Sequence, residues 1–353
     1  MSVVNGFTVN RYDRQERVRQ IGPAGQHQLN QAHVLIVGAG ALGSYCAELL
    51  TRAGVGRLDI FDPDTVSLTN LQRQTIFTEQ DAQQDTFKVD ALQKNLIKIN
   101  HHVIVHGHPY ELSESRLRTL DKFDLAIDCT DNFAARELLN QLALKYKFNY
   151  IFGSCAGVSG QVMAIDPQTG PCLACLFPNL QALKQTDCDL LGVNTALIPI
   201  VSGLQVSLAI KLLIAPDQMA FNQLITINNW TLKQDTFTIL KNPQCPVCQR
   251  PVTEVAADFK NELHVLCGTN VYAIYLPETI SVSVLKQYLT AQKIPQQANP
   301  LGVQFKWQAL AMTFFKNHKL MIYDAPTKTV AQTAYQQLTQ VLDQPQLKLE
   351  TQS

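Results

Sequence analysis

The sequence predicts an α/β protein in which a doubly wound, mostly parallel sheet is followed by a small α+β domain. Over the first two hundred residues, short apolar segments typical of buried strands alternate with longer segments typical of helices. Polar residues follow the expected strands, at the edge of the sheet where such proteins bind ligands. After about residue 250, short strands and two helices replace this alternation.

The alternating elements can be assigned in chain order from residue 33. We expect strands at 33–38, 57–64, 123–132 and 149–157, and helices at 41–54, 87–100 and 133–147. A later apolar segment, 196–215, is about as long as a membrane span, but it contains Pro199, Ser202, Gln205 and Lys211. We therefore expect this segment to form a buried helix.

The C-terminal elements are shorter and more closely spaced. We expect strands at 261–267, 271–276, 302–307, 309–315 and 319–324, and helices near 280–292 and 327–343. The segment 241–254, which is rich in Pro and Cys, separates them from the parallel sheet. The predicted domains are therefore residues 1–250 and 251–353.

Composition excludes several kinds of partner and location. The 353 residues include 29 Lys and Arg and 29 Asp and Glu, so bulk charge does not predict binding to nucleic acid or to an anionic membrane. The first twenty residues have no apolar stretch after a basic start, so we expect no secretory signal and a cytoplasmic protein. Nine cysteines in such a protein indicate thiols or metal ligands rather than disulfides.

Three glycines follow the first expected strand, in the Rossmann-like order Gly38, Gly40 and Gly43. Gly38 permits the tight turn, Gly40 lets the backbone approach a phosphate, and Gly43 lets the helix pack close to the sheet. The start of that helix offers free N–H groups to the phosphate. Asp62, at the end of the next strand, is placed to accept hydrogen bonds from ribose hydroxyls. The pattern predicts adenosine and phosphate, and nicotinamide does not follow from it.

Residues beyond Asp62 separate hydride transfer from nucleotidyl transfer. An enzyme that cleaves a triphosphate needs cations near the α-phosphate and a carboxylate for Mg²⁺, whereas a dehydrogenase needs neither. Residues of these types follow at predicted strand ends or helix starts: Asn70, Gln72, Arg73, Lys88 and Asp131. Each alone is also compatible with a solvated surface residue. Together they favour nucleotidyl transfer.

Five segments, in this order, make the chain resemble a known family. They are RYDRQ (11–15), VLIVGAGALGS (34–44), AGVGRLDIFDPDTVSLTNLQRQ (53–74), KVDAL (88–92) and DCTDN (128–132). They are similar to motifs of the MoeB/ThiF family of adenylyltransferases, bacterial relatives of the ubiquitin-activating enzymes. The resemblance extends from about residue 11 to residue 250.

The resemblance implies a role for each matching residue. Asp62 would hold the ribose, Asp131 would bind Mg²⁺, and Arg14 would reach into the active site of a partner subunit, which implies a homodimer. With Arg73 and Lys88, these residues would form the catalytic set. The implied nucleotide contacts are Gly38, Gly40, Ala41, Gly43, Asp62, Asp64, Thr69, Asn70, Leu71, Gln72, Arg73, Lys88, Asp131 and Asn132. Ala41 stands where many relatives have Gly, a mild departure because its backbone N–H is retained.

The resemblance also implies a substrate and a reaction. The substrate would be a small ubiquitin-like sulfur carrier, of the molybdopterin-synthase or thiamin type, that ends in Gly-Gly. Its terminal carboxylate would attack the α-phosphate of ATP, release pyrophosphate and leave an acyl-adenylate, which a persulfide donor protein would then convert. Two alternatives are an NAD-dependent oxidoreductase and a catalytically inactive binding protein of the same fold.

Two cysteine pairs predict a zinc site. Cys172 and Cys175 form one CxxC pair, and Cys245 and Cys248 form the other. Two such pairs can supply the four thiolates of a tetrahedral Zn²⁺ site, and members of the family resembled often carry them. A redox pair is the alternative for a single CxxC.

Other cysteines and histidines leave their roles open. Cys188 lies where the family resembled carries a loop thiol, so it is a candidate for sulfur or acyl transfer or a spare loop cysteine. Cys267 is expected in a buried strand, with a role in sulfur transfer as the alternative. His102, His106 and His108 fall on one face of a strand with no acid beside them in sequence, so we expect a solvated or edge-strand face, with metal binding as the alternative.

Overall fold

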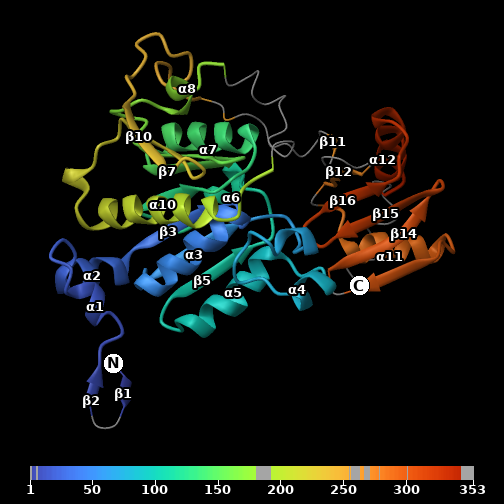
Figure 1. Cartoon of the computed structure of the whole chain (residues 1–353). Coiled ribbons are helices and arrows are strands. Elements are labelled where there is room, and N and C mark those ends of the chain that lie inside the picture. The colour runs from blue at the N-terminus through green and yellow to red at the C-terminus, as the bar shows by residue number, and fades with distance from the viewer. Residues whose placement is uncertain are drawn as a thin grey trace. The chain divides into compact units, whose positions relative to one another are not determined.

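The computed structural model describes residues 2–4, 7–179, 192–253, 255, 263–265, 271–277, 279–299 and 301–342. The chain divides into two compact units, Met1–Ala256 and Ala257–Ser353, and each is considered by itself (Figure 1).

The first unit contains one large sheet and its helices, preceded by a small hairpin. Its strands are β1 (Ser2–Val4), β2 (Phe7–Val9), β3 (His33–Val37), β4 (Arg57–Phe61), β5 (Ile104–His108), β6 (Leu125–Asp128), β7 (Tyr150–Ala156), β8 (Ser159–Ile165), β9 (Gln223–Asn228) and β10 (Lys233–Thr238). Its α-helices are α1 (Asp13–Glu16), α2 (Gly22–Gln31), α3 (Ala41–Ala53), α4 (Glu79–Gln83), α5 (Lys88–Ile99), α6 (Glu114–Leu117), α7 (Phe133–Tyr146), α8 (Leu173–Leu176) and α10 (Leu197–Ile214). Short 3₁₀ turns are η1 (Leu68–Asn70) and η3 (Pro216–Gln218).

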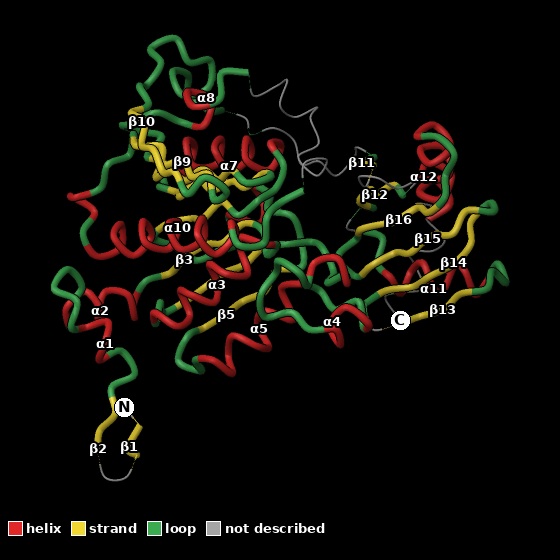
Figure 2. Tube along the Cα trace, viewed as in Figure 1, coloured by secondary structure: helices red, strands yellow, loops and turns green. Residues whose placement is uncertain are grey.

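The large sheet has the order β10-β9-β8-β7-β6-β3-β4-β5 (Figure 2). The five strands from β5 to β7 are parallel, and β8, β9 and β10 continue the sheet in antiparallel pairs. The chain runs from β3 outwards through β4 to β5 and then crosses to β6 on the other side of β3. This reversal creates the crevice where doubly wound sheets bind ligands. The predicted fold class is confirmed, and the antiparallel extension was not predicted.

Helices cover both faces of this sheet (Figure 1). Leu35, Val37 and Phe61 pack against Leu138 and Leu142 of α7 in one hydrophobic cluster. Helix α10 packs against α3 and against strands β7 and β8. Because alternate residues of a strand face opposite sides, both sides of the central strands are apolar.

Helix α10 is the one described helix that is long and apolar enough to cross a membrane by length and composition. Two of its polar side chains form hydrogen bonds inside the unit, in agreement with the buried helix that the sequence predicts. Ser202 donates to the Leu42 carbonyl at 3.2 Å, and Gln205 Nε2 donates to the Asp128 carbonyl at 2.8 Å. These two side chains therefore tie α10 to the start of α3 and the end of β6.

The described residues of the second unit form a six-stranded antiparallel sheet and two helices. Its elements are β11 (His264–Val265), β12 (Tyr272–Tyr275), α11 (Val282–Ala291), β13 (Gln296–Asn299), β14 (Gly302–Trp307), β15 (Leu310–Phe315), β16 (Lys319–Tyr323) and α12 (Lys328–Leu342). The strand order is β11-β12-β16-β15-β14-β13. Both helices bury apolar residues, among them Leu285 and Leu338, in one core with the strands.

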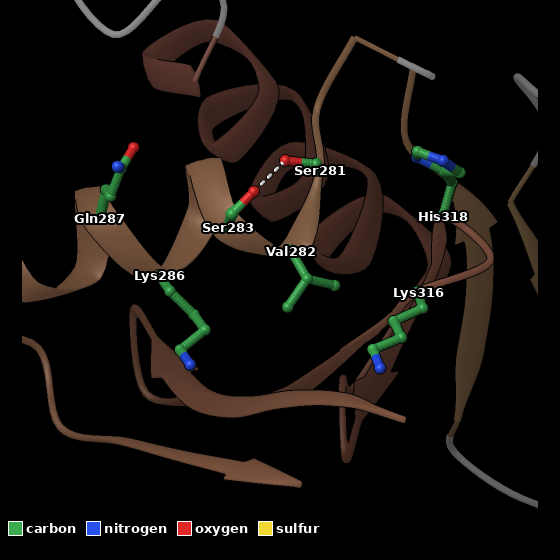
Figure 3. Close-up of a pocket in the computed structure, with 7 residues that line it drawn as sticks. All are labelled: Ser281, Val282, Ser283, Lys286, Gln287, Lys316 and His318. Carbon is green, nitrogen blue, oxygen red and sulfur yellow. Dashed lines mark hydrogen bonds between the residues drawn. The ribbon is translucent and has the colours of Figure 1, made fainter. Parts of the chain in front are cut away.

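An open hollow of about 590 Å³ lies at the start of α11 in this unit (Figure 3). Its lining includes Lys286 and Lys316, whose ammonium groups extend to the same side of Val282. Ser281 and Ser283 bond to each other at 2.7 Å across the first turn. None of the residues predicted to bind nucleotide lines this hollow.

Candidate active site

The turn after β3 is built by two glycines that no other residue could replace without rearrangement. Gly38 has φ +95°, and a Cβ there would lie 2.6 Å from the Cys129 carbonyl oxygen. A Cβ on Gly43 would collide with the Gly38 carbonyl. A Cβ on Gly40, in contrast, would meet no protein atom closer than 3.8 Å. The chain's own packing explains Gly38 and Gly43, and the approach of a ligand remains as the reason for Gly40.

Asp62 is fixed at the end of β4 beside this turn. Its Oδ2 accepts from the Ala39 N–H at 2.7 Å, and its Oδ1 accepts from the Asp64 N–H at 2.8 Å. Burial raises the pKa of Asp62 above its usual range, while the Lys88 ammonium and these two N–H donors oppose the rise. The carboxylate is thereby held rigidly, as a ribose-binding acid requires.

Lys88, the first residue of α5, faces three carboxylates. Its Nζ donates to Asp64 Oδ2 at 3.2 Å and lies 4.0 Å from Asp62 Oδ1. Burial lowers the pKa of Lys88, but the charges of Asp62, Asp64 and Asp131 outweigh burial and raise the pKa above its ordinary value. Lys88 is therefore a permanently charged ammonium, suited to a phosphate.

Asp131 and Asn132 follow β6 and are both exposed. Asn132 caps α7, because its Oδ1 accepts from the Ala135 N–H at 2.8 Å. Because β4 and β6 pair with β3 on either side, with Phe61 and Asp128 both opposite Val37, their carboxyl ends lie at the same edge of the sheet. The bond from Lys88 to Asp64 brings the start of α5 to this edge. An exposed carboxylate next to an ammonium is an oxygen ligand that suits Mg²⁺ bound together with phosphates.

A buried frame supports Asp131 from behind, and sequence reasoning missed it. Asp128 Oδ1 accepts from the Thr130 N–H and hydroxyl, at 3.0 and 2.7 Å. Arg136 Nη2 donates to the Thr130 carbonyl at 2.8 Å, and its guanidinium lies over the rings of Phe133 and Phe152. Burial raises the pKa of Asp128, and Arg136 opposes this. An arginine four residues after a predicted strand end, on the face of a helix that must be buried, was the available signal.

The segment from η1 to Arg73 carries the other predicted phosphate contacts. Asn70 caps η1 by accepting from the Ser67 N–H at 3.0 Å. Arg73 Nη1 donates to the Thr69 carbonyl at 2.9 Å, and Gln72 Oε1 accepts from the Thr195 hydroxyl at 2.5 Å. Thr69 and Leu71 complete this segment. The Arg73 side chain is thus bonded within its own segment, whereas the Gln72 side chain is bonded to Thr195, just before α10.

Arg14 lies away from the glycine turn of its own chain. Gln15 Nε2 donates to the Ala53 carbonyl at 3.0 Å, and Asn100 Nδ2 donates to the Tyr12 hydroxyl at 2.9 Å. These bonds hold α1 against the last turns of α3 and α5, at the amino ends of the parallel strands. The five residues of β3 span about 16 Å at roughly 3.3 Å per residue. An arginine side chain is too short to cross that distance to Gly38.

The four cysteines of the two predicted pairs converge. Sγ–Sγ distances are 3.9 Å for Cys172 and Cys175, 3.8 Å for Cys172 and Cys245, and 3.7 Å for Cys175 and Cys248. Four sulfurs at 2.3 Å from a tetrahedral centre lie about 3.8 Å apart. Within the described residues this is the one group of at least three ligating side chains close enough together for a metal ion. The donor set and spacing fit Zn²⁺.

The remaining cysteines do not belong to the four-cysteine cluster, and the described ones differ in their burial. Cys188 and Cys267 lie outside the described residues. Cys46 and Cys129 are buried, and Cys155 is half-buried.

A family model for ThiF matches residues 12–247, about two thirds of the sequence. The chain belongs to the ThiF family.

Individual members of the family show how far the likeness extends. The chain is 30% identical over 329 residues to the sulfur carrier protein ThiS adenylyltransferase of Bacillus subtilis, which covers 92% of this chain and 98% of that protein. It is 35% identical over 240 residues to the molybdopterin-synthase adenylyltransferase of Escherichia coli, which covers 67% of this chain and 95% of that protein.

Solved structures share the fold. A crystal structure of E. coli MccB with MccA-N7isoASN superposes with a TM-score of 0.61 at 21% identity, covering 70% of this chain and 76% of that one. The ThiF-family chain is thus an enzyme related to adenylyltransferases.

The expected edge-strand face of this ThiF-family chain is confirmed, because β5 is the outer strand of the sheet, but His106 and His108 also have an acid partner, which lies on β4. His108 Nε2 and His33 Nε2 each donate to the carboxylate of buried Asp59 at 2.6 Å, and Arg57 Nε donates to it at 2.8 Å. His106 Nδ1 lies 3.6 Å from the same carboxylate. The parallel register of β3, β4 and β5 brings them together.

His102 lies before β5 and outside this Asp59 cluster. The described histidines and Asp59 do not form a group compact enough for a metal ion. The Asp59 cluster is an ion-pair network inside the sheet.

Replacing Asp59 by Asn is expected to destabilise the protein by about 3 kcal/mol at neutral pH, because it leaves Arg57 without its buried carboxylate partner. Hydrogen bonds from the two histidines and the charge of Arg57 outweigh burial and hold the pKa of Asp59 well below its usual range. Its stabilisation is therefore complete above pH of about 4 and decreases as the pH falls below that value. Urea unfolding of both proteins at pH 7 and pH 3 measures it.

Asp121→Asn is the matched control. Asp121 binds Arg57 Nη1 at 2.6 Å, but its side chain is 77% exposed, so this change is expected to cost less than about 1 kcal/mol. Equal losses for Asp59→Asn and Asp121→Asn, or a loss for Asp59→Asn that does not become smaller from pH 7 to pH 3, contradict the assignment.

Proposed function

We propose that this ThiF-family enzyme uses ATP to adenylate the C-terminal glycine carboxylate of a small ubiquitin-like sulfur carrier. The observation that carries the proposal is the convergence of Gly40, Asp62, Lys88 and Asp131 at the carboxyl ends of neighbouring parallel strands. A hydride transferase has no use for an ammonium and an exposed carboxylate at the phosphates, so the oxidoreductase alternative is not favoured. The relatives named above are adenylyltransferases, which supports the same conclusion.

In the proposed step, a carboxylate oxygen of the carrier attacks the α-phosphorus of ATP. A new P–O bond forms, the bond from the α-phosphorus to the bridging oxygen breaks, and the electron pair leaves with pyrophosphate. A glycine carboxylate is ionised at neutral pH, so no general base is needed. Lys88 and Arg73 offset the charge on the phosphates, and Asp62 holds the ribose in position.

Asp131 would hold Mg²⁺, with Asn132 beside it. The ion would supply charge neutralisation for the phosphates. The frame of Asp128, Thr130 and Arg136 keeps the Asp131 segment in place before the nucleotide arrives. The nucleotide would contact the glycine turn and the segment 69–73.

The carrier is proposed to be of the ThiS type. The ThiS adenylyltransferase of B. subtilis is matched over 92% of this chain, which includes residues of the second unit. The molybdopterin-synthase adenylyltransferase of E. coli is matched over 67%. The proposed domains are therefore an adenylation domain, 1–250, and a second domain, 251–353, that is shared with the ThiS-type enzyme.

The functional unit is proposed to be a cytoplasmic homodimer in which Arg14 of one chain serves the site of the other. The distance between Arg14 and its own glycine turn supports this arrangement. Zn²⁺ at the four cysteines would be structural, because it joins segments more than seventy residues apart and lies outside the nucleotide-binding residues. A separate persulfide protein would supply sulfur to the adenylated carrier.

The test is exchange of labelled pyrophosphate into ATP. Exchange is expected with a ThiS-like carrier that ends in Gly-Gly, and it should disappear when the two glycines are deleted, because the attacking carboxylate no longer reaches the α-phosphorus. A MoaD-like carrier should support it less well. Exchange that is independent of any carrier contradicts the proposal.

A further inference from the structure

Gln74 is a buried amide whose nitrogen faces the glycine turn and whose oxygen accepts no hydrogen bond from the described residues. Its side chain is 5% exposed, and its Oε1 has no hydrogen-bond partner in the described part of the chain. Buried amide groups are nearly always hydrogen-bonded, because an unpaired one loses its contacts with water without compensation. The Gln74 amide is thus not saturated by the residues that the structure describes, and its nitrogen, which faces Gly40, can donate to a ligand.

The nearest feature of the turn is Gly40. The Gln74 amide nitrogen lies 3.8 Å from the position that a Cβ on Gly40 would take, and no other protein atom is as close as 4 Å. The space in front of Gly40 is therefore bounded by the backbone at the start of α3 on one side and by the Gln74 amide on the other. Gly40 is followed by the free N–H groups of a thirteen-residue helix, which attract anions.

The chain fixes Gln74 in this direction. Its N–H donates to the Asn70 carbonyl at 2.9 Å, and the next residue, Thr75, donates from its hydroxyl to Glu48 at 3.2 Å. Ile76 then adopts φ +75°, a conformation that is costly for a β-branched residue. The backbone is thus held on both sides of Gln74, and its amide has little freedom to turn elsewhere.

We propose that Gln74 is a further nucleotide-binding residue, whose amide N–H donates to phosphate oxygens of ATP at Gly40. This inference rests on the proposed use of ATP. An amide is suited to the position because it donates to phosphate without adding charge to a site that already holds Lys88 and Arg73.

Gln74→Leu tests the proposal, because leucine fills the same space without the amide. The dissociation constants of ATP and of adenosine are measured by equilibrium dialysis. Loss of a hydrogen bond to a charged group is expected to raise the Kd of ATP about tenfold to hundredfold. The Kd of adenosine should stay unchanged, since Gln74 contacts only phosphate. Gln80→Leu is the matched control and should change neither constant, because it makes the same substitution at an exposed position of α4.

Gln74→Glu keeps the shape if Gln74→Leu does not fold. Its carboxylate repels phosphate, so it should weaken ATP at least as strongly and leave adenosine binding intact. An unchanged Kd of ATP in either folded variant overturns the inference, and equal weakening of ATP and adenosine assigns Gln74 a structural role. A wild-type chain that binds no ATP refutes the proposed function itself.

Discussion

Mixing Arg14→Ala with Asp131→Ala is expected to restore activity that neither variant has alone. Each change removes a charged group from the phosphates and should reduce pyrophosphate exchange at least about a hundredfold. If Arg14 serves the partner's site, half of the dimers in an equal mixture are mixed, and each mixed dimer has one intact site. About a quarter of the wild-type activity should then return. The measurement is exchange after subunits have been unfolded and refolded together.

The pair Arg73→Ala and Asp131→Ala is the control for this mixing experiment. Both residues belong to the site of their own chain, so every site in a mixed dimer keeps one defect and the mixture should stay inactive. Recovery in the control, or none in the Arg14 mixture, contradicts an arginine supplied by the partner. Near-normal exchange by Arg73→Ala and Asp131→Ala separately removes their proposed roles.

Cys245→Ser is expected to remove zinc and to lower the melting temperature by about 10 °C. Substitutions that remove a structural metal can lower the free energy of unfolding by more than about 4 kcal/mol. Each kcal/mol lowers the melting temperature of a domain of this size by about 2–4 °C. Cys245 is buried against Cys172, so its loss opens the link between the segments around Cys172 and Cys248. Elemental analysis and thermal unfolding measure the two effects.

Cys155→Ser is the matched control, because Cys155 is a half-buried thiol outside the four-cysteine cluster. It should keep about one zinc per chain, like the wild type. Wild-type protein with less than about half an equivalent of zinc and with four reactive thiols at the cluster contradicts the metal assignment.

The parallel core of the fold could be predicted because its signals are local. Strand β3 is a continuous apolar run that ends in Gly38, and the glycine order specifies the turn and the helix that follow. Strand β13, in contrast, has the polar and mostly exposed sequence Gln296–Asn299, with no apolar alternation to reveal it. Strand β13 is held by backbone hydrogen bonds to β14, and the residue pattern of β13 gives no sign of this pairing.

The site was predictable where motifs mark strand ends and not where contacts join distant segments. Asp62, Lys88 and Asp131 lie at such ends, and the structure brings them together. The Asp59–His108 contact depends on the register of β4 with β5, across forty-nine residues of sequence. The burial of Gln74 against the glycine turn was not predictable for a similar reason. It depends on the path of the backbone through Ile76, and the residue type alone does not predict the positive φ there.

The central claim is that this ThiF-family enzyme joins AMP to the carboxyl end of a carrier protein. Mass spectrometry of a ThiS-like carrier after incubation with the enzyme, ATP and Mg²⁺ tests it most directly. We expect a carrier heavier by one adenylyl group, formed together with pyrophosphate and absent with Asp131→Ala. A carrier of unchanged mass, in the presence of enzyme that binds ATP, contradicts it.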